Sequence, residues 1–227
     1  MGLTDQSASE PQYGELAAGC FTSWLRRARH SLLTERESSV PCGDCRGCCS
    51  SYYFIHIRPE ERETLSRLDR RLLFPAPGLS KGHRLLGHFE DGACPMRIEA
   101  GCRIYTHRPV TCRMYDCRVF AAAGIMAGDA RQETINRRVR QWRFSYPTAG
   151  DRAAHEAVRA AGACIEAARQ GPEGQQLPSN PTQTALLALK VYRLFLPGGA
   201  AAKPASAADA ARAVLAEERR FESRRRA

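Results

Sequence analysis

The sequence has no hydrophobic run long enough to cross a membrane. Its most apolar stretch, residues 185–196, is twelve residues long and contains Lys190 and Arg193, whereas a membrane-spanning helix needs about 20 mainly apolar residues. The first eleven residues are polar, with Asp5 and Glu10, and they lack the basic segment and apolar run that mark a secretory signal. We therefore expect a soluble protein of the cytoplasm with no membrane partner.

The sequence also lacks the usual signatures of an active site. No Ser/His/Asp arrangement and no pair of carboxylates stands out, and no glycine-rich strand–loop–helix segment indicates a nucleotide site. No internal repeat of useful period is present. These absences favour a binding protein over an enzyme, but residues far apart in a sequence can meet in the fold. An enzyme in which an iron–sulfur cluster binds or activates a substrate therefore stays as the alternative.

Acidic residues are fewer than basic ones, 24 against 34, and the formal net charge is +10. Such an excess raises the question of nucleic-acid or ribosome binding. Against it, runs of charge are usually solvated helix faces, and Trp142 falls on the apolar side of its predicted helix instead of among the arginines. Nucleic-acid binding is therefore the least favoured alternative. The arginines concerned are Arg131, Arg137, Arg138, Arg140, Arg143 and the C-terminal group.

Cysteine is abundant, and eight of the ten cysteines lie between residues 42 and 117. In a reducing cytoplasm, clustered cysteines indicate metal ligands before disulfides. The x₂ spacing of the first group lets two sulfurs converge on one ion, and thiolate sulfur selects Zn²⁺, Cu(I) or iron–sulfur clusters. The first group is Cys42, Cys45, Cys48 and Cys49, and the second is Cys94, Cys102, Cys112 and Cys117.

The number and spacing of these cysteines bear on the kind of metal. Eight ligands exceed the four that a single zinc ion needs. The adjacent side chains of Cys48 and Cys49 are expected to point apart, which suits a cluster, two ions, or one ligand and one supporting thiol. These points favour an iron–sulfur cluster slightly over zinc. Neither group alone has comfortable fourfold geometry, so we expect the two groups to be neighbours in space.

Other residues are less strongly indicated as parts of the metal site. Pro109 predicts a helix start that places Cys112 in the first turn, where the helix dipole favours a thiolate. Cys20 and Cys164 are isolated on predicted helices and are expected to be buried as small apolar residues. His56 and His107 could replace a cysteine ligand, but a structural role is favoured. The arginines that flank the second group could donate to sulfur or be solvated: Arg103, Arg108, Arg113 and Arg118.

The periodicity of apolar residues predicts an α+β fold, mostly helical, with a loop-built metal site beside a short antiparallel element. Four regions are expected: an amphipathic helix (14–33) in residues 1–39, the cysteine-rich region 40–125, a helical region 126–197 packed on it, and an Ala/Arg-rich flexible tail, 198–227. Strands are expected at residues 52–57 and 84–89. Helices are expected after Pro59 and from Asn180-Pro181 to Pro197, and Asp151 is a candidate cap.

The order of motifs resembles a known family. Cys42 to Cys49 form a CxxCxxCC signature, followed by Cys94-Pro95, by the run from Cys102 to Tyr105, and by residues 108–113 (RPVTCR). This order is similar to that of the bacterial YkgJ-type cysteine-cluster family, the CxxCxxCC zinc- or iron-chelating domain. The resemblance covers about residues 40–125.

The resemblance implies that the eight cysteines are ligands and leaves the metal open. One branch of the family, flagellin lysine methylase, couples such a motif to methyl transfer. That activity does not carry over to this chain, because no nucleotide-binding pattern accompanies the motif. The expected function is a non-catalytic metal-binding protein whose protein partners the sequence does not name.

Overall fold

The computed structural model describes residues 14–169, 171–201 and 206–226. The polar N-terminal segment considered above lies outside these residues. Helices make up 53% of the structure and strands 11%, with short antiparallel sheets, which confirms the expected class. Within the described ranges, no helix is long and apolar enough to cross a membrane.

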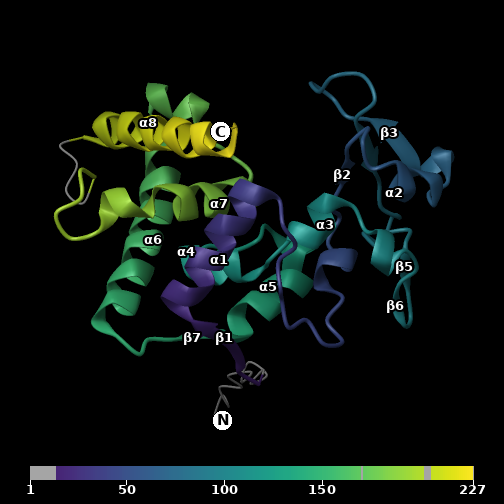
Figure 1. Ribbon diagram of the computed structural model, residues 1–227, viewed down its shortest axis with the longest axis horizontal. Helices are drawn as coiled ribbons and strands as arrows, with labels where there is room; N and C mark the ends of the chain where they lie inside the picture. The colour runs from purple at the N-terminus through teal and green to yellow at the C-terminus, as the bar shows by residue number, and fades with distance from the viewer. Residues whose placement is uncertain (1–13, 170, 202–205, 227) are drawn as a thin grey trace, which may run out of the picture.

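Helices dominate the chain in the order shown in Figure 1. They are α1 (Phe21–Thr34), α2 (Arg62–Ser66), α3 (Val110–Met114), α4 (Arg118–Ala123), α5 (Glu133–Gln141), α6 (Ala149–Ala168), α7 (Pro181–Val191) and α8 (Ala207–Arg226). The strands are β1 (Leu16–Cys20), β2 (Ile55–Ile57), β3 (Leu73–Pro75), β4 (Arg84–Leu86), β5 (Arg97–Ile98), β6 (Gly101–Cys102) and β7 (Trp142–Ser145).

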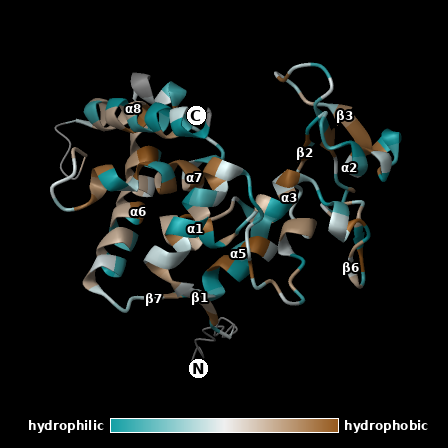
Figure 2. Ribbon diagram, in the orientation of Figure 1, coloured by the Kyte–Doolittle hydropathy of each residue, from teal (hydrophilic) through white to brown (hydrophobic). Residues whose placement is uncertain are grey.

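Two hydrophobic cores divide the molecule into two lobes, which Figure 1 shows side by side. The main lobe (14–39, 115–169, 171–201 and 206–226) packs α1, α4, α7 and α8 around the long helix α6. Figure 2 shows α7 as largely hydrophobic, in agreement with its burial in this core. The small lobe (51–109) contains the antiparallel sheet β2-β4-β3 and the β5-β6 hairpin. The first cysteine loop (40–50) and α3 lie between the lobes.

The N-terminal helix begins later than expected. Residues Leu16–Cys20 form a strand that pairs in parallel with β7, and α1 starts only at Phe21. Gly19 has a φ of +93°, outside the helical range, so a continuous helix from residue 14 is wrong. This pairing could not be read from the local pattern, because the partner strand lies more than 100 residues away along the chain.

Helix starts in the second half of the chain follow the expected cap chemistry. Asn180 caps α7 by accepting hydrogen bonds from the backbone N–H groups of Thr182 and Gln183, and Pro181 takes the first helical position. At α6 the cap is Thr148, while Asp151 completes a capping box with it. We expected Asp151 itself to be the N-cap residue. It stands instead three residues later, and its side chain accepts from the backbone N–H of the N-cap residue. α7 ends at Val191, and a 3-10 helix continues to Phe195.

The C-terminal residues 207–226 are helical and pack against the main lobe. Ala207–Arg226 form α8, which packs on α6, α7 and α1. The helix buries Ala210, Ala211, Val214 and Phe221. We expected a flexible tail because large apolar residues are sparse after residue 198. Small alanines suffice here, since they let the helix approach its neighbours closely.

The small-lobe strands are shorter than expected. β2 covers 55–57 and β4 covers 84–86, within the predicted ranges. Tyr52 leaves the strand because it adopts a left-handed conformation, φ 58°, and its ring packs on Gly92. The backbone N–H of Tyr52 donates to the carbonyl of Gly92. This contact holds the turn before Cys94 against the end of the first cysteine loop.

Candidate metal centre

The first cysteine loop is anchored on the main lobe. A 3-10 helix, Gly47–Ser50, carries Cys48 and Cys49 and packs against α5. Gly47 lies so close to α5 that a Cβ there would be 3.3 Å from the carbonyl oxygen of Thr134. The Ser51 hydroxyl donates to the carbonyl of Gly47 at 2.6 Å. A small residue at position 47 therefore fixes where the cysteine side chains emerge.

The adjacent cysteines of this loop lie close together. The Sγ atoms of Cys48 and Cys49 are 3.9 Å apart, so the expectation that they point apart is wrong. Their mutual hydrogen bond lowers the pKa of Cys49 to about 7 and raises that of Cys48, because one thiol holds the proton for the other. The charges of nearby arginines lower the pKa of Cys49 further. Cys49 of this pair also lies beside Cys94 of the second group.

Three cysteines of the second group lie beside Cys49. The backbone N–H of Cys94 donates to the carbonyl of Cys49 at 2.9 Å. Cys94 and Cys102 both pack against the small-lobe core. Burial raises the pKa of Cys112, on α3, and the neighbouring thiols of Cys94, Cys49 and Cys102 raise it further. The two cysteine groups are therefore neighbours in space, as expected.

The fourth cysteine of that group, Cys117, belongs to the main lobe. It packs against the main core, and the indole Nε1 of Trp142 donates to its Sγ at 3.2 Å. Burial raises the pKa of Cys117 to about 12, although the hydrogen bond from Trp142 acts in the other direction. The thiols of Cys42 and Cys45 are close enough to raise the same pKa.

Two arginines that the sequence did not link to the metal site donate to backbone carbonyls of the cysteine loop. Arg46 donates to the carbonyl of Cys45, and its guanidinium lies 3.6 Å from where a Cβ of Gly101 would be, beside Cys102. Arg138 donates to the carbonyl of Cys42 and lies over the ring of Trp142. The Nε–H of each arginine is buried without a hydrogen-bond partner among the described residues. Arg46 could have been suspected from its place inside the motif; Arg138 could not.

The arginines expected to flank the second group divide in their roles. Arg108 is an electrostatic neighbour of Cys49, Cys102 and Cys112. Arg118 is buried and holds Asp116 instead, with an Nη2–Oδ2 distance of 2.7 Å. Arg103 is exposed.

The remaining candidates are engaged elsewhere. His56 Nε2 lies 2.8 Å from Nδ1 of His83, and His107 pairs with Glu63, so the favoured structural role fits both. Cys20 donates to the Asp151 carboxylate at 3.1 Å. Cys164 is half-buried on α6.

The residues present fit a thiophilic metal. Within the ranges that the structure describes, no three Cys, His, Asp or Glu side chains already converge as a finished coordination shell. Eight thiols nevertheless gather around one loop, and the two unpartnered arginine Nε–H groups beside them would find acceptors in thiolate or sulfide sulfur. The donor set is soft, so zinc and iron–sulfur clusters suit it better than hard cations.

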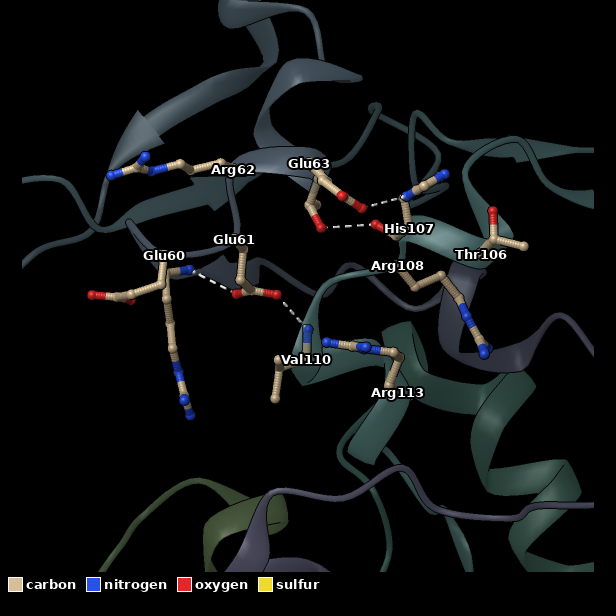
Figure 3. Close-up of a pocket in the computed structure, with 11 residues that line it drawn as sticks. Glu60, Glu61, Arg62, Glu63, Thr106, His107, Arg108, Val110 and Arg113 are labelled. Carbon is tan, nitrogen blue, oxygen red and sulfur yellow. Dashed lines mark hydrogen bonds and ion pairs between the residues drawn. The ribbon is translucent and has the colours of Figure 1, made fainter.

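A polar cavity of about 550 Å³ adjoins α3 on the small-lobe side. Figure 3 shows Glu61 pointing toward Val110 and His107 beside Glu63. The Glu61 carboxylate accepts from the backbone N–H groups of Arg58 and Val110. Because Val110 opens α3, Glu61 caps the short helix that carries Cys112.

Comparison with known proteins agrees with this arrangement. Residues 41–142 match the family model of the CxxCxxCC zinc- or iron-chelating domain. This segment is therefore similar to that domain. It takes in all eight clustered cysteines and extends to Trp142, well past residue 125, where the sequence resemblance ended. No curated protein and no solved structure matches the chain. The matched segment thus spans the small lobe, the cysteine loop and the part of the main lobe that contacts it.

Proposed function

We propose that this protein holds a thiophilic metal through Cys42, Cys45, Cys48, Cys49, Cys94, Cys102, Cys112 and Cys117, and that this binding, not catalysis, is its main activity. One observation carries the proposal: the fold brings the second group of cysteines, 45 or more residues away along the chain, against the first loop. All ten cysteines are free thiols in the structure, so the eight clustered ones are available as metal ligands.

The close approach of Cys48 and Cys49 does not favour iron over zinc. Two thiolates on one tetrahedral zinc, each about 2.3 Å from the ion, would lie about 3.8 Å apart. The 3.9 Å between Cys48 and Cys49 Sγ therefore suits zinc as well as a cluster. The number of thiols does not separate the two metals either, because a zinc ion and an iron–sulfur cluster each take four cysteine ligands and eight thiols can serve two such centres.

The test is the colour and metal content of the full chain purified without oxygen. An iron–sulfur protein is expected to be brown, to absorb broadly in the visible, to bleach with dithionite, and to contain iron and acid-labile sulfide. A colourless preparation with stoichiometric zinc and no sulfide would replace iron with zinc and leave metal binding intact. A protein that takes up neither metal when its thiols are reduced would overturn the proposal.

A further inference from the structure

The eight cysteines separate by the hydrophobic core against which they pack. Cys94 and Cys102 pack on the small-lobe core, whereas Cys117 packs on the main core. These two cores share no residue. A single centre that used all of these sulfurs would have to draw ligands from two separately packed bodies. The cysteine loop between the lobes can instead supply ligands to each side.

On the small-lobe side, four cysteines lie close to one another. Cys49 is tied to Cys94 by the backbone hydrogen bond of 2.9 Å. Cys102 lies on β6, opposite Arg97 of β5, whose backbone N–H donates to the carbonyl of Cys94. Cys112 is an electrostatic neighbour of Cys49, Cys94 and Cys102. Arg46, with its unpartnered Nε–H, lies on this side, against Gly101.

On the main-lobe side, three cysteines lie close to one another. Cys42 and Cys45 are joined by a backbone hydrogen bond of 3.0 Å, and both are electrostatic neighbours of Cys117. Arg138 connects them, because it donates to the carbonyl of Cys42 and stacks on Trp142, which donates to Cys117 Sγ. Arg138 also has an unpartnered buried Nε–H, so each side has one such donor.

Cys48 is the remaining thiol, and it neighbours members of both sides, Cys42 and Cys112 as well as Cys49. We assign Cys48 to one side by counting the ligands that each side already has. The small-lobe side has four sulfurs without Cys48, which is the number that a closed zinc site or a cubane cluster uses. The main-lobe side has three and needs a fourth.

We infer that the chain holds two adjoining four-thiolate centres, a main-lobe centre of Cys42, Cys45, Cys48 and Cys117 and a small-lobe centre of Cys49, Cys94, Cys102 and Cys112. The inference rests on the proposed function and adds to it the number of centres and the ligands of each. The neighbouring residues Cys48 and Cys49 stand where the centres meet, which explains why the motif ends in two adjacent cysteines. Each centre takes a soft metal, either one Zn²⁺ or one iron–sulfur cluster.

The first test counts zinc. The reduced full chain is loaded with Zn²⁺ alone, and the metal per chain is measured after excess is removed. The wild type is expected to hold two zinc ions. Replacing Cys42 and Cys117 by Ala, or Cys94 and Cys102 by Ala, is expected to leave one ion in each case. Cys164→Ala is the matched control and should keep two, because Cys164 lies on α6 away from the cluster.

The second test needs no variant, and so does not depend on a mutant that folds. Zinc is withdrawn from the wild type in steps with a chelator, and exposed thiols are alkylated and located by mass spectrometry. Partly depleted molecules are expected to carry four new labels, all from one of the two sets. Molecules that pass from none to eight labels together, or labels that mix the sets, would overturn the division. Wild-type protein that binds no metal would overturn the proposed function instead.

Discussion

At the residue scale, a few N–H donors set the electrostatic environment of the cysteines. Trp142 donates directly to Cys117 Sγ, and Gly47 N–H lies 3.4 Å from Cys45 Sγ. Arg46 and Arg138 bring positive charge, and Arg138 lowers the pKa of Cys42 against the effect of burial, which raises it. Donors of this kind stabilise thiolates and so strengthen metal binding.

Trp142→Phe tests the role of the indole. The phenyl ring keeps most of the packing but removes the N–H that donates to Cys117, so the affinity of the main-lobe centre is expected to fall about 10–100-fold. The small-lobe centre of the same molecule is the internal control and should be unchanged. The measurement is a chelator competition with thiol mapping. An equal loss at both centres would show that Trp142 acts through general stability.

The Asp151 side chain connects the first turn of α1 with the start of α6. Its buried carboxylate accepts hydrogen bonds from Cys20, from both the backbone N–H and the hydroxyl of Thr22, and from Thr148. The hydrogen bond from Thr22, followed by those from Thr148 and Cys20, lowers the pKa of Asp151 well below its ordinary range. A carboxyl group with a lowered folded pKa stabilises the fold above its unfolded pKa, about 3.9, and loses that contribution as the pH falls toward the folded pKa.

Asp151→Asn should therefore be less stable than the wild type at neutral pH. The difference should shrink as the pH is lowered below about 4, because the carboxyl group of the unfolded wild-type chain then takes up a proton, whereas the folded chain binds it only as the pH nears its lower folded pKa. Urea unfolding followed by circular dichroism at several pH values measures both quantities. A difference that is independent of pH would show that the amide fails for steric reasons and that the charge has no part.

At the element scale, helix α6 organises the main lobe by close approach. Gly162 faces α4, and a Cβ at this position would lie 2.8 Å from the carbonyl oxygen of Ala123. Ala161 and Ile165 are fully buried on the same helix. The alanine-rich composition of α6 thus permits α4 to lie against it, and α4 directly follows Cys117.

Gly162→Ala is expected to lower the free energy of unfolding by about 1–3 kcal/mol, because backbone atoms must move to admit the methyl group. Gly150→Ala is the matched control on the same helix. Its Cβ would meet only the Thr148 hydroxyl, at 3.6 Å, so this change should be neutral or should stabilise by up to about 1 kcal/mol through helix propensity. Chemical denaturation of both variants measures the two changes in the free energy of unfolding. Equal effects would contradict the close packing of α6 on α4.

At the scale of the whole molecule, the two lobes have cores of unequal size. The small-lobe core consists of five buried side chains, Ile57, Leu68, Leu86, Met96 and Ile104, with Cys94 and Cys102 packed against it. The main core is much larger and includes Phe21, Trp24 and Phe120. A small core contributes little stability by itself. Metal bound by Cys94 and Cys102 would therefore matter most to the small lobe.

Removal of metal is expected to open the small lobe while the main lobe stays folded. Amide hydrogen exchange of the reduced full chain, with and without metal, measures this. Protection should fall in residues 51–109 and stay largely unchanged in α6 and α7, because Cys94 and Cys102 pack on the small core whereas α6 and α7 are held in the much larger main core. Loss of protection throughout both lobes would show one cooperative unit, and no change would show that metal adds nothing to stability.

Some features follow from the sequence alone. Spacing and residue type are local, so the CxxCxxCC motif and the Asn180-Pro181 helix start could be predicted. The soft donor chemistry follows from cysteine itself, which is why the class of metal could be stated before the fold was known.

Other features depend on contacts between distant segments, and only the tertiary structure decided them. The strand before α1 exists because β7 lies beside it, and α8 is helical against α6 and α7 although its own large apolar residues are few. The proposed division of the cysteines belongs here as well. Cys112 and Cys117 are only five residues apart, but α3, which carries Cys112, ends at Met114, and the chain then enters the main core, against which Cys117 packs. Spacing shows which residues are able to bind metal, whereas packing determines which of them can share one.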